Sequence, residues 1–258
     1  MRCCCHLLGE VPYGRAWALQ KRLAAEIAAG QRPPTLLLLS HPPTYTFGRR
    51  GRSEHLLLGE EEARRRGFEV VWSDRGGDIT YHGPGQVVGY PLLPLAPLRP
   101  HAEEEGSRRL PTADYVGYLR RLEAVLLQAL TVWGVRGFRM AGMTGVWVRL
   151  PGGEPAKIAA IGVRVDARGV SRHGFALNVA TDPAHWQGIV GCGLHGYAVA
   201  NLADILPHPP AWDDVVAALA AAFAAQFRCR WQPCDAELPD GIIATPCPSS
   251  SGDRATAS

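Results

Sequence analysis

Reactive side chains are most concentrated in residues 75–86, which read Arg-Gly-Gly-Asp-Ile-Thr-Tyr-His-Gly-Pro-Gly-Gln. The glycines of this segment accept positive φ and let backbone N–H groups come close to a bound molecule. A glycine-rich turn between two strands would account for the glycines and the proline. It would not account for the polar side chains gathered around them, which are Arg75, Thr80, Tyr81, His82 and Gln86. We therefore interpret the segment as a loop that binds a substrate or takes part in catalysis.

Lysine is rare in this chain, which makes one lysine conspicuous. Of the 27 Lys and Arg residues, only Lys21 and Lys157 are lysine. Arginine stays protonated in proteins, whereas the pKa of a buried ammonium shifts readily, so that lysine can act as an acid or a base. Lys21 falls on a predicted helix, where a solvated charge is expected. Lys157 begins the strand-like run 157–165 and is the better candidate for chemistry.

Cys192 is a candidate nucleophile. It lies in residues 188–196, Gly-Ile-Val-Gly-Cys-Gly-Leu-His-Gly, with a glycine on each side. Glycine neighbours leave a thiolate accessible, as nucleophilic attack requires. An inert, buried cysteine is the other interpretation, because that is the more common fate of a free cysteine. This residue by itself does not decide between the two.

The cysteines as a set indicate a reducing compartment. There are seven, an odd number, and their spacing is irregular, so we expect free thiols in the cytosol. The run Cys3-Cys4-Cys5 could suggest a metal, but adjacent cysteines cannot easily all bind one ion, and no CxxC motif accompanies them. We therefore expect no metal site. Cys229 and Cys234 are expected to pack near the last helix.

The composition is that of a globular protein. The chain has 258 residues, 47% of them hydrophobic, and a formal net charge of +3. This weak charge gives little reason to expect a nucleic-acid partner, and no run of about 18 apolar residues predicts a membrane span. The first residues lack the pattern of a secretory signal, so we expect a cytoplasmic protein. We find no P-loop, dinucleotide-binding glycine motif or HExxH motif.

The predicted elements mix helices with strands. The sequence predicts helices at 15–29, 60–66, 111–130 and 213–228. It predicts strands at 35–40, 68–72, 87–93, 144–148, 157–165 and 173–179. This mixture indicates a single α/β domain over residues 1–245, with a central mixed β-sheet flanked by helices. Residues 246–258 are rich in small polar residues, and we expect a disordered tail there.

Together, these motifs resemble those of the octanoyltransferase family of lipoate biosynthesis. The resemblance is carried, in the expected order between Leu8 and Leu206, by segments 36–43, 46–51, 75–86 with the following Gly89-Tyr90-Pro91, 157–165, 173–179 and Cys192-Gly193. Several independent motifs agree, which makes the resemblance specific.

The resemblance implies a fold like that of lipoate–protein and biotin–protein ligases, and no cofactor. It implies transfer of an octanoyl group from octanoyl–acyl carrier protein, through a cysteine thioester, to a lysine on lipoyl domains of 2-oxoacid dehydrogenase E2 subunits or on glycine-cleavage H protein. Cys192 would form the thioester, and Lys157 would lower the pKa of its thiol. The substrate would be bound by Arg75, Gly76, Gly77, Asp78, Ile79, Thr80, Tyr81, His82, Ala160, Ile161, Gly162, Gly174, Phe175 and Ala176.

One position departs from the family pattern, which usually has proline just before the cysteine, where this chain has Gly191. Glycine loosens a loop without removing a reacting group. Two other functions remain open. An ATP-dependent lipoate– or biotin–protein ligase of the same fold would not need Cys192. A non-catalytic acyl-carrier-binding protein would never form a covalent adduct, and Gly191 would then mark a decayed site.

The sequence leaves open which groups stabilise the tetrahedral intermediates. Backbone N–H groups near Gly77 or Cys192-Gly193, and the side chain of His82, are candidates. Ile161 and Phe175 suit the wall of a channel for an acyl chain.

Overall fold

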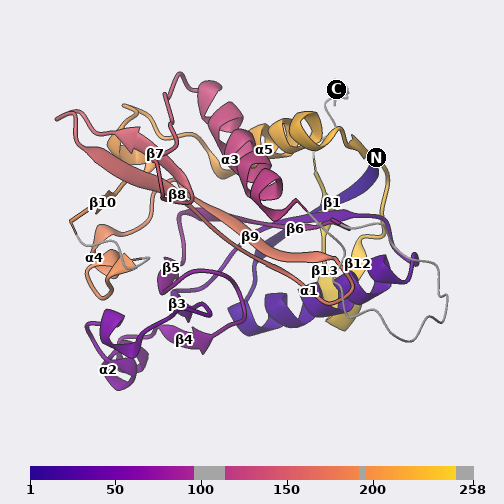
Figure 1. Cartoon of the computed structure of the whole chain (residues 1–258), viewed down its shortest axis with the longest axis horizontal. Coiled ribbons are helices and arrows are strands. Elements are labelled where there is room, and N and C mark those ends of the chain that lie inside the picture. Colours follow the sequence, from indigo (N-terminus) through magenta and orange to yellow (C-terminus); the bar gives the residue numbers. More distant parts are fainter. Residues whose placement is uncertain (96–113, 192–195, 248–258) are drawn as a thin grey trace, which may run out of the picture.

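The computed structural model describes residues 1–95, 114–191 and 196–247, so Cys192 lies outside the described residues. The strands of the main sheet are β1 (Arg2–Glu10), β2 (Thr35–Ser40), β6 (Gln86–Leu92), β7 (Val146–Arg149), β8 (Pro155–Val165), β9 (Ser171–Asn178), β10 (Ala198–Val199), β11 (Arg230–Trp231) and β14 (Thr245–Pro246). Within the described ranges these nine strands are ordered β10-β8-β9-β6-β2-β1-β11, with β7 beside β8 and β14 beside β1 (Figure 1). β2, β6, β9 and β8 are antiparallel neighbours, whereas β1 runs parallel to β2.

Helices cover both faces of this sheet. α3 (Tyr115–Thr131) and α5 (Trp212–Phe227) pack together on one face, and α1 (Tyr13–Ala28) lies on the other (Figure 1). The four leucines at 36–39 of β2 are all buried, as expected for a strand that is covered on both faces. The predicted single α/β domain with a mixed sheet between helices is confirmed. None of the helices in the described ranges is long and apolar enough to cross a membrane.

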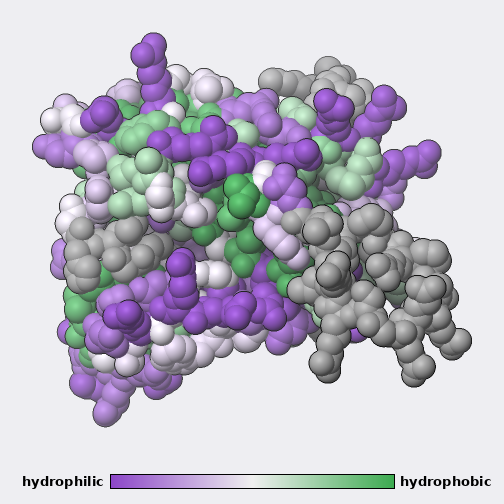
Figure 2. Space-filling view, in the orientation of Figure 1, coloured by the Kyte–Doolittle hydropathy of each residue, from purple (hydrophilic) through white to green (hydrophobic). Residues whose placement is uncertain are grey.

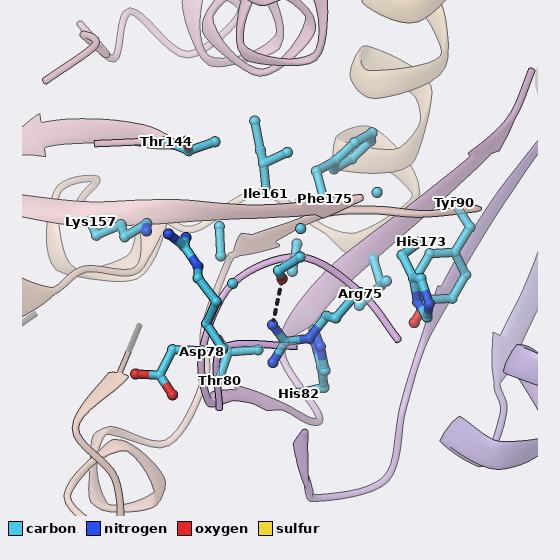
Figure 3. Close-up of a pocket in the computed structure, with 18 of the residues that line it drawn as sticks. Arg75, Asp78, Thr80, His82, Tyr90, Thr144, Lys157, Ile161, His173 and Phe175 are labelled. Carbon is cyan, nitrogen blue, oxygen red and sulfur yellow. Dashed lines mark hydrogen bonds between the residues drawn. The ribbon is translucent and has the colours of Figure 1, made fainter. Parts of the chain in front are cut away.

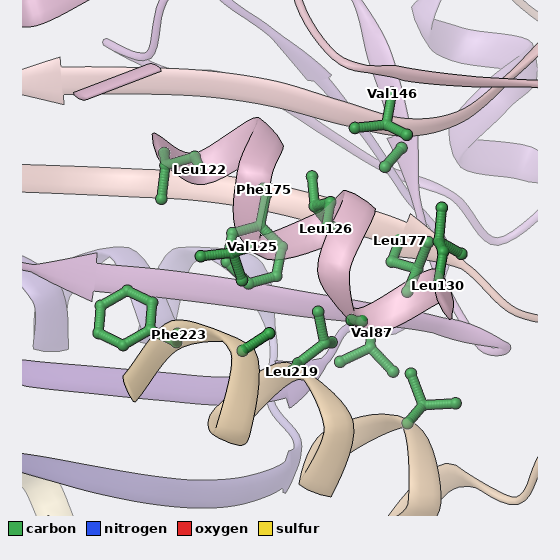
Figure 4. Packing of buried hydrophobic residues seen from close by; sticks show 14 of the residues in the cluster. Val87, Leu122, Val125, Leu126, Leu130, Val146, Phe175, Leu177, Leu219 and Phe223 are labelled. Carbon is green, nitrogen blue, oxygen red and sulfur yellow. The ribbon is translucent and has the colours of Figure 1, made fainter. Parts of the chain in front are cut away.

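The larger core lies under α3 and α5. Leu122, Val125 and Leu126 of α3 pack with Leu219 and Phe223 of α5 over the sheet (Figure 4). These residues recur at helical spacing, so each helix turns one apolar stripe toward the strands. Burying one such side chain contributes about 1.5–3 kcal/mol. This layer therefore fixes the strands that position the candidate site.

A second sheet has three strands in the described residues. They are β3 (Thr44–Phe47), β4 (Glu69–Trp72) and β5 (Thr80–His82), in the order β4-β3-β5, and α2 (Glu60–Arg65) contacts β4. Its core is aromatic: the rings of Tyr45 and Phe68 stack with their centres 4.5 Å apart, and Tyr81 packs against both. Figure 1 shows this small sheet below β8, at the lower left. It gives the glycine-rich segment 75–86 a rigid support.

Most predicted helices and strands are present, with ends shifted by a few residues. The sequence did not predict β1, β3 or β5. The last two lie in segments that we expected to be loops, because the glycines and prolines around them hide three- and four-residue strands. β1 was missed because Cys-Cys-Cys-His has no alternation of apolar and polar residues. The remaining short elements are η1 (Ser53–His55), α4 (Pro183–Trp186), η3 (Leu202–Asp204), β12 (Glu237–Leu238), η4 (Pro239–Gly241) and β13 (Ile242–Ile243).

Four cysteines form disulfides, which corrects the expectation of free thiols for these four, whereas Cys3 and Cys229 are free. Disulfides join Cys4 to Cys234 and Cys5 to Cys247. The Cys3 and Cys229 sulfur atoms lie 2.8 Å apart. The sequence could not reveal these pairs, because their members are more than 220 residues apart along the chain.

The same region changes the expected end of the domain. Thr245 and Pro246 form β14, which pairs antiparallel with β1, and the next residue is the disulfide-bonded Cys247. The first two residues of the predicted tail therefore belong to the folded domain. The rest of that tail, 248–258, lies outside the described residues.

Candidate active site

A cavity of about 190 Å³ opens between the main sheet and the small sheet. Its walls come from the loop before β5, from β5, and from β6, β8 and β9 (Figure 3). On the face shown in Figure 2, hydrophobic residues gather near the centre between hydrophilic ones. The cavity is lined by Tyr13, Arg50, Arg75, Gly76, Gly77, Asp78, Thr80, His82, Val88, Tyr90, Gly142, Met143, Thr144, Lys157, Ala160, Ile161, Gly162, His173, Gly174, Phe175 and Ala176.

Most of the residues predicted to bind substrate lie together in this cavity. They are Arg75, Gly76, Gly77, Asp78, Thr80, His82, Ala160, Ile161, Gly162, Gly174, Phe175 and Ala176, together with the predicted catalytic Lys157. Ile79 and Tyr81 do not line it, because both side chains are buried in the core of the small sheet. The Tyr81 hydroxyl there lies 2.7 Å from His185 Nδ1. Alternation along β5 explains this split, since Thr80 and His82 point to one side of the strand and Tyr81 to the other.

One wall of the cavity is apolar. Ala160 of β8 and Ala176 of β9 are paired across the two strands and line it. The side chains of Ile161 and Phe175, which the sequence suggested as a channel wall, point to the other face of the sheet and pack in the core under α3 and α5 (Figures 3 and 4). Gly89 of β6 makes room for the phenyl ring, because a Cβ atom at that position would lie 2.2 Å from Phe175 Cζ. The apolar wall offers a hydrocarbon group of a ligand a dry surface to bind.

Arg75 brings a buried positive charge to the cavity. Its side chain is 6% exposed. Nε and Nη2 donate to Thr46 Oγ1 at 3.1 and 2.9 Å, Nη2 also donates to the Thr46 carbonyl, and Nη1 donates to the Gly76 carbonyl at 3.0 Å. All of these acceptors are neutral. The charge is therefore not cancelled by them and remains available to an electron-rich group of a ligand.

The loop that carries Arg75 is held by close backbone contacts. Gly77 has φ 90°, which favours glycine. A Cβ atom on Gly48 would lie 2.4 Å from the Gly77 carbonyl oxygen, so the two loop segments touch. The Gly76 N–H donates to the Val163 carbonyl of β8 at 3.0 Å. At the other end of the loop, Asp78 Oδ2 lies 2.5 Å from His55 Nδ1.

Lys157 lies where the main cavity meets a smaller one of about 20 Å³, which shares Thr80 with it. The lysine is partly buried, and its Nζ lies 5.7 Å from the ring centre of Trp147. The Thr80 hydroxyl is buried and has no hydrogen-bond partner within the described residues. Since an unpaired buried hydroxyl is costly, Thr80 is ready to bond a ligand beside the lysine.

Cys192, the predicted nucleophile, lies outside the described residues, but its predecessor is described. Gly191 lines the smaller cavity together with Lys157 and Trp186. A Cβ atom on Gly191 would meet nothing closer than Trp186 at 3.8 Å, and its φ is not in the left-handed region. Glycine is therefore not required at this position by the backbone or by crowding.

His82 lines the cavity as a neutral imidazole. Its Nδ1 lies 2.7 Å from Gln86 Oε1, and the amide of Gln86 donates to the Tyr81 carbonyl and to Asn178 Oδ1. Because Gln86 Oε1 can only accept, Nδ1 carries the ring proton and Nε2 keeps its lone pair. Burial is the main cause that lowers the pKa of His82 well below its usual value, and the nearby positive charge of Arg75 acts in the same direction. At neutral pH the ring therefore offers a ligand an acceptor rather than the donor that an oxyanion needs.

His173 holds the start of the wall formed by β9. It has φ 56°, a left-handed conformation that is uncommon outside glycine. Its N–H donates to Gln20 Oε1 at 2.7 Å, and its Nε2 donates to Asp74 Oδ1 at 2.8 Å. Burial alone would raise the pKa of Asp74, but hydrogen bonds from His173 and Arg172 outweigh it and lower that pKa. These bonds fix the backbone just before the lining residues of β9.

His41 supports the cavity from behind. It is fully buried, its Nδ1 donates to the Val11 carbonyl at 2.6 Å, and its Nε2 accepts from the Tyr90 hydroxyl at 2.7 Å. Burial lowers its pKa from 6.5 to about 4. The neutral imidazole therefore holds Tyr90, which lines the cavity, in a fixed position.

Several cavity residues were not predicted to bind substrate from the sequence. They are Tyr13, Arg50, Val88, Tyr90, Gly142, Met143, Thr144 and His173. Met143 and Thr144 lie between Gly142 and Gly145, the same kind of glycine-framed segment that made residues 75–86 conspicuous.

The segment 142–145 is held in place by a buried carboxylate, that of Glu123. Glu123 is 1% exposed and accepts from Arg120 at 2.7 Å and from Arg139 at 2.9 Å. Its other oxygen lies 3.3 Å from the Gly145 nitrogen. The helical position of Glu123, surrounded by leucines, gives no sign of this role in the sequence.

The sequence is similar to those of known proteins over most of its length. Residues 12–224 match the family described as the lipoyl protein ligase A/B catalytic domain. A protein of Chloroflexus aurantiacus named octanoyltransferase is 44% identical over 222 residues, which cover 86% of this chain and 92% of that protein. One of Rubrobacter xylanophilus with the same name is 45% identical over 197 residues, which cover 76% of this chain and 80% of that protein.

Solved structures support the fold. A bipartite lipoate protein ligase from Thermoplasma acidophilum is similar with a TM-score of 0.66 at 18% identity, over 91% of this chain and 87% of that chain. A lipoate-protein ligase A bound with ATP is similar with a TM-score of 0.65 at 17% identity, over 91% and 89% of the two chains. At these identities the likeness concerns the fold alone, and it confirms the expected fold of the lipoate–protein ligases. The chain belongs to the lipoyl protein ligase A/B catalytic-domain family and, within it, to the octanoyltransferases.

Proposed function

We propose that this protein transfers an octanoyl group from octanoyl–acyl carrier protein to a lysine of lipoyl domains, through a thioester on Cys192. One observation carries the proposal: Lys157 and the predecessor of Cys192 line the same small cavity, which adjoins the larger one. The names of the relatives, octanoyltransferase, support the acyl group. One structural neighbour is a lipoate protein ligase described together with its E2 lipoyl domain, which supports the acceptor.

The acyl chain lies along the apolar wall in this proposal. Ala160 and Ala176 contact its methylene groups, and Gly76 and Gly77 bring backbone close to it. Arg75 lies near the carbonyl end, where a buried positive charge stabilises an oxygen that gains negative charge. Ile79 and Tyr81 act on binding only indirectly, by anchoring β5 in the core of the small sheet.

The first half-reaction forms the acyl-enzyme. The Cys192 thiolate attacks the thioester carbonyl of the acyl carrier protein, and a tetrahedral intermediate forms. The carrier sulfur then leaves as a thiol, taking up the proton that Cys192 had lost. The Lys157 ammonium favours the Cys192 thiolate, because an adjacent positive charge lowers the pKa of a thiol. One thioester replaces another, so no ATP is consumed.

The second half-reaction makes the amide. Acylation removes the negative charge of Cys192, so Lys157 then loses its proton more readily and can act as a base. It accepts a proton from the incoming amine of the lipoyl domain, the amine nitrogen attacks the thioester carbonyl, and the Cys192 sulfur leaves. Arginine at 157 could serve the first step but not this one.

Thr80 is a better candidate than His82 for stabilising the tetrahedral intermediates. Its hydroxyl is buried beside Lys157 and has no partner within the described residues, whereas the ring proton of His82 is already bonded to Gln86. Backbone N–H groups beside Gly77 remain a further candidate.

The protein partners follow from the chemistry proposed. The donor is octanoyl–acyl carrier protein, and the acceptors are lipoyl domains of 2-oxoacid dehydrogenase E2 subunits and the glycine-cleavage H protein. Arg50 both lines the cavity and is exposed, so its positive charge is placed to meet an acidic partner protein.

Intact-protein mass spectrometry tests the proposal. The full chain is mixed with octanoyl–acyl carrier protein without ATP, beside Cys192→Ser. We expect the mass of one octanoyl group to be added, to be labile to hydroxylamine and to be absent in the variant. No adduct with an active carrier protein would contradict the proposal. Transfer that required ATP and survived Cys192→Ser would instead indicate a lipoate– or biotin–protein ligase, and binding without transfer would indicate an acyl-carrier-binding protein.

A further inference from the structure

A cluster of sulfur and nitrogen atoms lies in the part of the main sheet away from the cavity. Cys4 and His6 are alternate residues of β1, so their side chains point to the same face of the strand. Cys234 reaches them from the segment after β11. One ligand-type atom from each of the three residues lies within 4.8 Å of the other two. None of the three is among the residues that line the catalytic cavity.

His6 is the member of this cluster that a disulfide does not explain. The side chain is 1% exposed, and its Nε2 atom is buried without a hydrogen-bond partner in the described part of the chain. Buried polar atoms in folded proteins nearly always have a partner, so an unpaired one is consistent with a bound ion or water molecule. The neighbouring ligand atoms belong to Cys4 and Cys234, and sulfur is a weak hydrogen-bond acceptor but a strong metal ligand.

On the opposite face of β1, cysteines are paired with other cysteines, and no histidine belongs to the pairs. Cys3 lies beside Cys229, and Cys5 is bonded to Cys247, all within or against the apolar core under α5. Alternation along β1 separates these sulfurs from Cys4. The run of three cysteines therefore need not share one ion, which removes the objection that the sequence raised against a metal.

We propose that Cys4, His6 and Cys234 form a zinc site in the reduced protein, and that the Cys4–Cys234 disulfide replaces it on oxidation. Two thiolates and one imidazole are a ligand set that zinc favours. Zinc is usually tetrahedral. Cys234 is only partly buried, so a water molecule can reach the fourth position.

The exchange between the two states is balanced. A dithiol reductant gives two electrons and two protons to the Cys4–Cys234 bond and is itself oxidised to a disulfide. Zinc then displaces the two thiol protons. In reverse, hydrogen peroxide takes two electrons from the two zinc-bound thiolates and, with two protons, becomes two molecules of water, while the disulfide forms and zinc leaves.

Both states serve the same structural purpose. The disulfide and the zinc ion each tie β1 to the segment between β11 and β14, which is otherwise held by these two short strands and by core packing of Leu238, Ile242 and Ala244. A reduced, metal-free chain would lose this tie. The site would therefore keep the C-terminal segment in place in either a reducing or an oxidising environment.

Zinc content and redox state are measured together on the full chain. The protein is reduced with a phosphine under argon, loaded with zinc sulfate, freed of excess metal by gel filtration and analysed by plasma mass spectrometry. We expect stoichiometric zinc in the reduced protein, background zinc after peroxide, and a Cys4–Cys234 peptide only after peroxide. Cobalt in place of zinc should give the visible bands of a tetrahedral ion and the near-ultraviolet absorption of cobalt–thiolate bonds.

Three variants separate this site from general folding. His6→Gln and Cys234→Ser should weaken zinc binding by more than the roughly 10–100-fold that loss of an outer partner causes. Cys229→Ser, which removes a thiol from the opposite face, is the matched control and should retain stoichiometric zinc. Far-ultraviolet circular dichroism checks that each variant is folded.

The wild-type chain provides a readout that does not depend on any variant. Zinc should slow alkylation of Cys4 and Cys234 in the reduced protein and leave alkylation of Cys3 and Cys229 unchanged, as mapped by peptide mass spectrometry. A reduced wild type without zinc, zinc retained by a folded His6→Gln, or equal protection of all four thiols would each overturn the proposal.

Discussion

The catalytic cavity and the cysteine-bearing edge of the sheet hold their side chains in opposite ways. In the cavity, hydrogen bonds position the groups but leave bonding capacity unused, as with the Thr80 hydroxyl and the uncompensated charge of Arg75. At the edge formed by β1, β11 and β14, two disulfides hold the chain. The contrast indicates that bonding capacity left unused inside a cavity is available to a ligand. At the edge, the unpaired Nε2 of His6 beside Cys4 and Cys234 supports the proposed zinc site.

Lys157→Arg should produce the largest effect and tests the cavity side of this comparison. We expect octanoyl transfer to a lipoyl domain to fall by about 10²–10⁴-fold, the usual contribution of a general base. Acylation of Cys192 should persist, because arginine still supplies a positive charge. Single-turnover mass spectrometry of the two half-reactions measures both.

The chain offers a matched control for this variant. Lys21, the other lysine, lies on α1 with its Nζ 3.8 Å from the ring centre of Trp17 and does not line the cavity. Lys21→Arg should leave both half-reactions unchanged. An equal loss of acylation and transfer in Lys157→Arg would contradict the division of roles proposed for the lysine.

Reduction of the disulfides tests the cysteine side. Removing a native disulfide typically lowers the free energy of unfolding by about 2–4 kcal/mol, more for long loops, and here the bonded residues are 230 and 242 positions apart. We expect the thermal midpoint to fall when reductant and a metal chelator are present together. Octanoyl transfer at moderate temperature should change little, because no cysteine of either pair lines the cavity.

Two controls keep this test specific. Added zinc should reverse part of the fall in the thermal midpoint of the reduced protein, since it replaces the Cys4–Cys234 disulfide. The double variant Cys5→Ser/Cys247→Ser retains the other pair and should show a smaller response to reductant. A midpoint that reductant and chelator leave unmoved would mean that sulfur does not hold this edge.

The sequence predicted the chemistry of the cavity better than it predicted the geometry of the edge. Local motifs mark the cavity, because a glycine-framed loop and a rare lysine can each be recognised from a few consecutive residues. Thr80 faces the cavity and Tyr81 faces the core because both belong to the strand β5. This strand has only three residues, too few to be predicted from the sequence. The pairing of β1 with residues near 230 and 246 depends on the whole fold, so no local pattern could reveal it.

The buried His41 predicts a dependence of stability on pH. Burial lowers its pKa from 6.5 in the unfolded chain to about 4 in the folded one. Between these values the unfolded state binds more protons, so the stabilisation is complete above pH 6.5 and is lost as pH falls toward 4. At about 1.4 kcal/mol per pH unit, the loss amounts to about 3 kcal/mol.

Urea denaturation across this range measures the effect. His41→Gln, which keeps a hydrogen-bonding side chain without a titrating group, should reduce the slope of the free energy of unfolding against pH by the part that His41 contributes. His208→Gln changes an exposed histidine and serves as the control. The same slope in the wild type and in His41→Gln would assign the acid sensitivity to other groups.

Gly191→Pro should produce the smallest effect, and it tests whether catalysis requires a flexible backbone just before Cys192. Gly191 has room for a side chain, with Trp186 no closer than 3.8 Å, and its φ is not left-handed. Proline at such a site restricts the unfolded chain and stabilises a protein by about 0.4–1 kcal/mol. We expect a slightly higher thermal midpoint and an unchanged rate of acyl-enzyme formation.

Gly191→Ala is the control, because it separates the loss of glycine from the gain of proline. If only the proline variant fails to form the adduct, the loop must move during acylation. The two regions would then differ in a further way: disulfides fix the edge of the sheet, whereas part of the cavity wall moves during the reaction.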